Sequence, residues 1–221
     1  MGLLRKRPER PSRYAPVRPE PPALRYVEVD DREYECYVVP SPNGSWEVAY
    51  GRAMDGGSSV AILLEDGSPR TKLAVPRPIE AVVANDGTHV IVDGGNASSI
   101  GGELVARSAT GESCLTHRFD ANVATVDLTA DGRFAVASTR GSGAKAVLFD
   151  VHDGTVRTEF STESTDGALL GFGSDDEHVY FSRGKTVPYF AIDVDGEIAW
   201  RSERFRDAES FSSRLRRWIA H

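Results

Sequence analysis

Short hydrophobic runs alternate along this 221-residue chain with polar turns, and the pattern recurs about every forty-four residues. One series of turns carries Asn or Asp and steps by 43, 45 and 45 residues: Pro42-Asn43-Gly44, Asn85-Asp86-Gly87, Ala130-Asp131-Gly132 and the glycine-free Asp175-Asp176-Glu177. A second series steps by 44, 43 and 42 residues: Asp66-Gly67, Thr110-Gly111, Asp153-Gly154 and Asp195-Gly196. Two interleaved series at one period predict four copies of one structural unit.

Each copy divides into four strand-like segments. The segment after the first turn is apolar on both faces in every copy and spans residues 47–51, 90–94, 134–141 and 179–184. A strand with two apolar faces indicates a sheet that is covered on both sides. Four short strands at this period are typical of β-propeller blades. The sequence therefore predicts an all-β propeller of four blades over residues 26–206, with residues 26–29 covering or extending one edge.

The closure of such an array follows from the number of blades. Propellers usually have four to eight blades. An open array of four would leave sheet edges and an apolar face exposed, which favours aggregation. We therefore expect a closed four-bladed monomer, and the alternative is a half-ring that a second copy completes.

Some of the repeats resemble those of known propeller families. The run from Ala191 to Trp200 contains an Asp, a glycine turn and a Trp, and it resembles the repeat of quinone-type propellers; the run from Leu148 to Gly154 keeps the Asp and the turn. The first turn, Ser41-Pro42-Asn43-Gly44, is similar to that of WD-type and YVTN-type propellers. The resemblance covers about four-fifths of the chain. It implies the propeller superfamily, leaves the family open and implies no quinone cofactor.

The charge of the chain is divided between its body and its ends. Residues 1–25 hold seven basic and two acidic groups and six of the twelve prolines, whereas residues 26–200 hold 13 basic and 28 acidic groups. We expect residues 1–25 to form a disordered basic tail. Only four of the 26 basic residues are lysines, a bias that resembles the proteins of salt-loving archaea.

The C-terminal residues 207–221 show a different periodicity. Phe211, Leu215, Trp218 and Ile219 are spaced as one stripe of a helix, with arginines beside them. This pattern predicts a short amphipathic helix that packs on the propeller itself or docks a partner. The candidate partner-binding residues are Phe211, Leu215, Trp218, Arg214 and Arg217.

No arrangement of residues predicts a catalytic, cofactor-binding or metal site. The five histidines share no ligand spacing. His89 aligns with Trp46, Phe134 and Val179 in a packing position, and His178 precedes that position by one residue. Cys36 and Cys114 are expected to be reduced thiols, since the N-terminus lacks the apolar run of a signal peptide.

These observations favour a non-enzymatic scaffold for protein–protein interaction in the cytoplasm, acting as a monomer or homodimer. One alternative is a factor that binds nucleic acid or an anionic membrane through the basic tail and the C-terminal helix. The other alternative is an enzyme or ligand-binding protein that uses the propeller channel.

Overall fold

A computed structural model describes residues 22–95, 100–141, 144–161, 169–173, 175–183 and 187–201, and every regular element in these ranges is a strand. The strands form four antiparallel sheets in which each strand pairs with the next along the chain. Sheet 1 contains β1 (Ala23–Val29), β2 (Arg32–Pro40), β3 (Trp46–Ala53), β4 (Ser59–Glu65) and β5 (Ser68–Ala74). Sheet 2 contains β6 (Pro78–Val83), β7 (His89–Asp93), β8 (Gly102–Arg107) and β9 (Ser113–Phe119).

Sheet 3 contains β10 (Val123–Leu128), β11 (Phe134–Thr139), β12 (Lys145–Asp150) and β13 (Thr155–Ser161). Sheet 4 contains β14 (Leu169–Phe172), β15 (His178–Arg183), β16 (Val187–Asp193) and β17 (Ile198–Arg201). The expectation of an all-β fold with four repeated antiparallel sheets is confirmed. Within the described ranges, no helix is long and apolar enough to cross a membrane.

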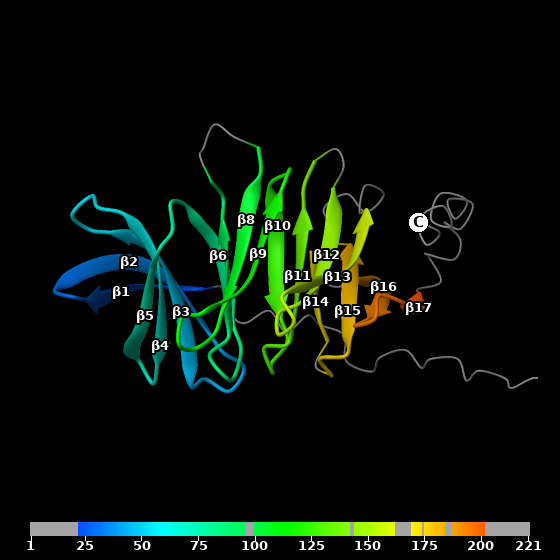
Figure 1. Cartoon of the computed structure of the whole chain (residues 1–221), viewed down its shortest axis with the longest axis horizontal. Coiled ribbons are helices and arrows are strands. Elements are labelled where there is room, and N and C mark those ends of the chain that lie inside the picture. Colours follow the sequence, from blue (N-terminus) through cyan, green and yellow to red (C-terminus); the bar gives the residue numbers. More distant parts are fainter. Residues whose placement is uncertain are drawn as a thin grey trace, which may run out of the picture.

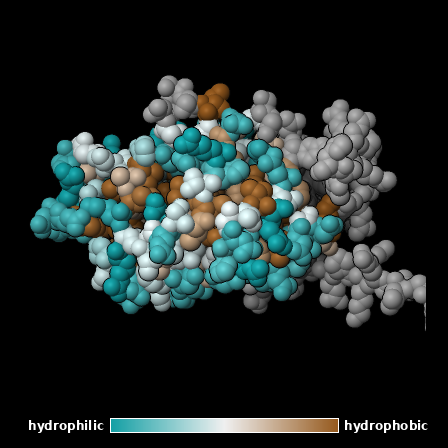
Figure 2. Space-filling model, in the orientation of Figure 1, coloured by the Kyte–Doolittle hydropathy of each residue, from teal (hydrophilic) through white to brown (hydrophobic). Residues whose placement is uncertain are grey.

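The hydrophobic core lies between neighbouring sheets. Val48 and Leu63 of sheet 1 pack with Ile91 of sheet 2, and Val92 of sheet 2 packs with Phe149 of sheet 3. The third layer joins sheets 3 and 4 through buried residues that include Val136, Leu148, Val179 and Phe181. In Figure 2 the hydrophobic residues on the visible face gather along its middle, between hydrophilic margins. The two-faced apolar pattern therefore reflects sheets that are covered on both sides.

The row of sheets is open. The sheets follow one another in chain order, with sheet 1 at one end and sheet 4 at the other (Figure 1). Strands of consecutive sheets pack together, β3 against β6, β6 against β10 and β10 against β14. A closed ring of four would need a quarter turn between neighbours, whereas broad apolar faces stack closer to parallel. The arrangement thus differs from the closed four-bladed ring that the sequence favoured.

Sheet 1 differs from the others because it has a fifth strand and curls upon itself. The added strand, β1, pairs with β2 through a two-residue turn in which Asp30 and Asp31 both have positive φ, 54° and 57°. It starts at Ala23, inside the segment expected to be a tail. At the other edge of the sheet, Lys72 of β5 forms an ion pair with Asp30. A side-chain ion pair therefore links the β1–β2 turn to β5 across sheet 1.

Gly51 of β3 permits this curl. A Cβ at this position would collide with the carbonyl oxygen of Glu35 and lie 2.8 Å from the Cα of Cys36. A strand glycine of this kind marks a tight bend or a close approach of two backbones. The concave face holds its own core, in which Tyr34, Cys36 and Ile62 are buried. Burial raises the pKa of the Cys36 thiol to about 11.

Candidate binding groove at the inner strands

A groove of about 680 Å³ runs along the inner strands, and all four sheets contribute to it. Its lining includes Ala23, Arg25, Val38 to Pro42 and Glu47 of sheet 1, Val82 and Val83 of sheet 2, Asp127, Leu128 and Ala130 of sheet 3, and Phe172, Gly173 and Asp176 of sheet 4. The groove forms where the first strands of sheets 2 to 4 lie side by side and meet the end of β2. It is a product of the open row of sheets.

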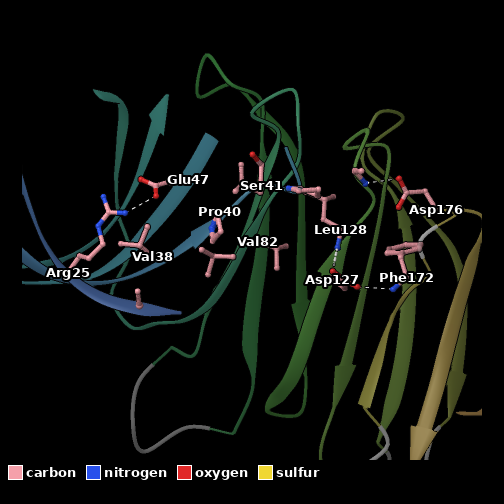
Figure 3. A pocket seen from close by; sticks show the side chains of 16 residues that line it. Arg25, Val38, Pro40, Ser41, Glu47, Val82, Asp127, Leu128, Phe172 and Asp176 are labelled. Atoms are coloured by element: carbon pink, nitrogen blue, oxygen red, sulfur yellow. Dashed lines mark hydrogen bonds and ion pairs between the residues drawn. The ribbon is translucent and has the colours of Figure 1, made fainter. Parts of the chain in front are cut away.

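The floor of the groove is apolar and its ends are charged. Figure 3 shows Val38, Val82, Leu128 and Phe172 along the floor. Arg25 and Glu47 lie at one end, where their side chains form an ion pair of 2.7 Å. Asp176 lies at the other end, and Asp127 lies between Leu128 and Phe172. An extended ligand could therefore bury apolar side chains between two polar ends.

Hydrogen bonds between the first turns of neighbouring sheets fix one rim of the groove. The backbone N–H of Asn43 donates to Oδ1 of Asn85 at 2.8 Å, and the N–H of Asn85 donates to the carbonyl of Ala130 at 2.9 Å. The N–H of Ala130 donates in turn to Oδ2 of Asp176 at 2.9 Å. The four turns thus form one hydrogen-bonded series, which we call the turn relay.

Asp127 also joins neighbouring sheets within the groove. Its Oδ2 accepts a hydrogen bond of 2.7 Å from the N–H of Phe172, and its Oδ1 accepts one of 2.9 Å from the N–H of Leu128. Both carboxylate oxygens therefore hold backbone groups of inner strands. We infer that Asp127 positions sheet 4 against sheet 3.

The fourth turn carries aspartate where the other three carry glycine. Asp176 has a φ of 54°, and the corresponding turn glycines, Gly44, Gly87 and Gly132, have φ between 76° and 85°. Each of these four residues donates its N–H to the carbonyl three positions earlier. The sequence alignment had paired Asp176 with the residue before the glycine. It was wrong by one residue because the fourth turn has no glycine to mark its register.

The same one-residue misalignment changes the repeat position to which His178 is assigned. Trp46, His89, Phe134 and His178 each begin the second strand of their repeat and pair with the last residue of the third strand. His178 therefore takes the position that the sequence alignment gave to Val179. The expected packing role of His89 is confirmed, since this residue is 3% exposed and its Nδ1 lies 3.0 Å from the carbonyl of Gly87.

A side chain like that of Asp176 would collide in the second and third turns, whereas the first turn has open space around Gly44. A Cβ on Gly87 would lie 2.8 Å from the Cβ of Ala109, and one on Gly132 would lie 2.8 Å from the Cβ of Thr88. A residue other than glycine with positive φ costs on the order of 1 kcal/mol, and aspartate adopts this conformation more readily than most residues, as Asp66 does in another turn of this chain. Asp176 accepts this conformation and places a carboxylate on the groove.

The surroundings of Asp176 disfavour its charged form. Burial raises its pKa, and the nearby carboxylates of Asp131 and Asp175 raise it further, against the hydrogen bond from Ala130. The neighbouring carboxylate behaves differently. Although burial acts to raise the pKa of Asp175, hydrogen bonds from His178 and from the backbone of Glu177 outweigh it and lower the pKa. Asp176 is therefore the carboxylate that would gain more from a bound cation.

The structure does not place the candidate partner-binding residues that the sequence analysis named. Phe211, Leu215, Trp218, Arg214 and Arg217 lie outside the described residues. Within the part of the chain that is described, no three His, Cys, Asp or Glu side chains are grouped to hold a metal ion. The sequence did not predict the groove. The one signal it contained was the turn at Asp176, which lacks the glycine found in the other three turns.

Comparisons with known proteins concern the fold. No family model matches the chain, and no curated protein matches it. Hydrazine synthase from Kuenenia stuttgartiensis matches with a TM-score of 0.49 and 13% identity over 67% of this chain and 45% of that one. The β-propeller domain of the Trilobed protease from Pyrococcus furiosus matches with a TM-score of 0.49 and 12% identity over 71% of this chain and 52% of that one. The chain thus spans about half the length of these structures.

One of these matches corrects an expectation from the sequence. We expected a protein without enzymatic activity, but hydrazine synthase is an enzyme. The match is partial and of low identity, so it shows a shared fold and says nothing of a reaction in this chain.

Proposed function

We propose that this protein is a protein-binding module that holds an extended segment of a partner in the groove. The observation that carries the proposal is one groove to which four sheets contribute an apolar floor, with charged groups at its two ends. Its volume of about 680 Å³ is that of a site for several side chains. The partner segment would place apolar side chains over Val82, Leu128 and Phe172.

Asp176 supplies the specificity in this proposal. Its carboxylate is held by the turn and by the N–H of Ala130, so that the side chain loses little conformational entropy on binding. Because it is partly desolvated already, an Arg or Lys of the partner would form a charge-assisted hydrogen bond at a reduced cost. We therefore propose a segment that combines apolar residues with one basic residue.

A display library of extended peptides tests the proposal. We expect the wild-type protein to enrich peptides with apolar residues and one Arg or Lys. Asp176→Asn keeps a hydrogen-bond acceptor in the turn, and it should weaken the selected peptide about tenfold. Leu128→Lys places a charge on the floor and should abolish binding.

Glu177→Gln is the matched control for charge. Glu177 is an exposed neighbour in the same turn and does not line the groove. Its substitution removes one negative charge and should leave the affinity unchanged. Equal losses in the Asp176 and Glu177 variants, or no enriched peptide, would refute the proposal.

We also propose that the chain belongs to the β-propeller superfamily, in which the alternatives are WD-type repeats, YVTN-type repeats and the quinone-type family. Asp193, in the run that resembles that family, accepts hydrogen bonds at its Oδ1 from the N–H groups of Asp195 at 3.0 Å and Glu197 at 2.8 Å. Asp150 accepts one at its Oδ1 from the N–H of Asp153 at 3.0 Å. These contacts support a structural role for the repeated aspartate in shaping the second turn.

A further inference from the structure

Sheet 4 has an apolar outer face at the end of the row. Val179 and Phe181 of β15 pack on sheet 3, so Tyr180 between them points to the opposite face. Tyr180 pairs with Ala191, and Ala191 pairs with Trp200, which places the three residues on that outer face. Tyr180 corresponds to Val136 of sheet 3, since each is the third residue of its strand. Val136 packs toward the next sheet, and Tyr180 faces the place where a fifth sheet would lie.

This outer face is buried. Tyr180 is 5% exposed and Ala191 is 1% exposed. The part of the chain that the structure describes has four sheets, and none of the other three lies on this face. A cover has to come from outside the repeats or from another molecule.

We propose that the C-terminal segment 207–219 packs on the outer face of sheet 4 and closes the row there. The apolar stripe of this segment, Phe211, Leu215, Trp218 and Ile219, has the spacing of one helix face. A helix with one apolar stripe needs an apolar surface against which to bury it. The Tyr180–Ala191–Trp200 stripe provides such a surface at the end of the same chain.

The chain length allows this contact. Strand β17 ends at Arg201, and five residues separate it from residue 207. Five extended residues span about 17 Å. The strand that carries Tyr180 lies two strands away from β17, a distance of about 10 Å. The segment can therefore turn back onto the sheet that it follows.

A second copy of the chain fits this face less well. Two half-rings would complete each other by packing sheet 4 of one copy on the outer face of sheet 1 of the other. That face of sheet 1 is already filled by its own curl, in which Tyr34 is 2% exposed and Cys36 and Ile62 are 0% exposed. The curl therefore argues against a ring made of two copies.

Disulfide trapping tests the proposal directly. Ala191→Cys and Leu215→Cys would be combined in a Cys114→Ser background, and mild oxidation should give a disulfide within one monomer. The control pairs Leu215→Cys with Leu24→Cys, because Leu24 is 56% exposed at the far end of the row. This pair should not form a disulfide. A disulfide between two chains would instead assign the face to a second copy, and absence of the expected disulfide would also refute the proposal.

Hydrogen exchange gives a second test. In the full-length chain, Trp218→Ser should accelerate amide exchange in residues 178–181 and 190–193 about tenfold, since the cover would be weakened. Exchange in residues 60–64 of sheet 1 should not change. Unchanged exchange in sheet 4, or equal acceleration in both sheets, would contradict the proposal. Neither test depends on the groove, so the two proposals can fail separately.

Discussion

The first and fourth sheets both end the row of repeats, and they differ in how their outer faces are covered. Sheet 1 has five strands, and an ion pair between Lys72 and Asp30 links its β1–β2 turn to β5. Sheet 4 has four strands and leaves Tyr180 and Ala191 on a face without a fifth sheet to pack against. A repeat array needs a cover at each end, because every internal sheet relies on two neighbours. The comparison teaches that one end can be covered by curvature within a sheet, and the other needs a further segment.

Gly51→Ala should have the largest effect, because it disturbs the curl of sheet 1. The added Cβ would collide with the backbone of β2, so we expect a loss of about 5 kcal/mol or more in the free energy of unfolding. The measurement is urea unfolding followed by circular dichroism. Gly56→Ala is the control, since Gly56 has a positive φ of 79° and open space around it, and this substitution should cost about 1 kcal/mol from the backbone angle alone. Equal losses would mean that the curl does not depend on Gly51.

Val136→Asp tests how firmly sheet 4 is held. Val136 is 1% exposed between sheets 3 and 4, so a carboxylate there should cost about 3–5 kcal/mol, measured in the same way. Phe134→Asp is the comparison within the same strand. The guanidinium groups of Arg133 and Arg157 lie 4.8 Å and 6.0 Å from the Phe134 ring centre, and they would partner the new carboxylate. A larger loss for Phe134→Asp than for Val136→Asp would contradict this account.

The smallest effect concerns the pH dependence that Asp176 gives to sheet 4. Its pKa in the folded protein lies above the ordinary value of 3.8, so the folded state binds more protons than the unfolded state between these two values. Stability should therefore fall as the pH rises through this window. Asp176→Asn should remove this contribution and change the melting temperature by on the order of 1–3 °C across it.

Asp175 provides the opposite case for the same measurement. Its pKa is lowered in the folded protein, so its contribution to stability is present above pH 3.8 and is lost as the pH falls through the lowered value. Asp175→Asn should therefore reduce the decrease in melting temperature that occurs as the pH falls below 3.8. A similar pH profile for both variants would show that the two carboxylates do not differ as described.

The sequence predicted those features that each repeat encodes locally. The Asn and Asp turns and the apolar strands after them gave the four sheets, and residues 26–29 gave part of β1. The fourth repeat was misaligned by one residue because Asp176 replaces the glycine that marked the turn in the others. Closure could not be predicted, since it depends on the angles between packed sheets.

The groove could not be predicted for a related reason. Its residues come from inner strands that are about forty-five positions apart, and none of them has a recognisable motif with its neighbours. Val82, Leu128 and Phe172 are ordinary strand residues until the sheets lie side by side. Only Asp176 departs from the local rule of its repeat, and it is the residue on which the proposed specificity depends.

The turn relay has a mechanical consequence. It ties the four sheets together along one rim. Away from these turns, side-chain packing joins the sheets, and Asp127 adds a hydrogen bond between sheets 3 and 4. Sheets that are joined along one rim can rotate about that rim, so that their opposite ends move apart. The width of the groove would then change with the angle between the sheets. Binding of a ligand at the inner strands would therefore be coupled to the arrangement of all four sheets.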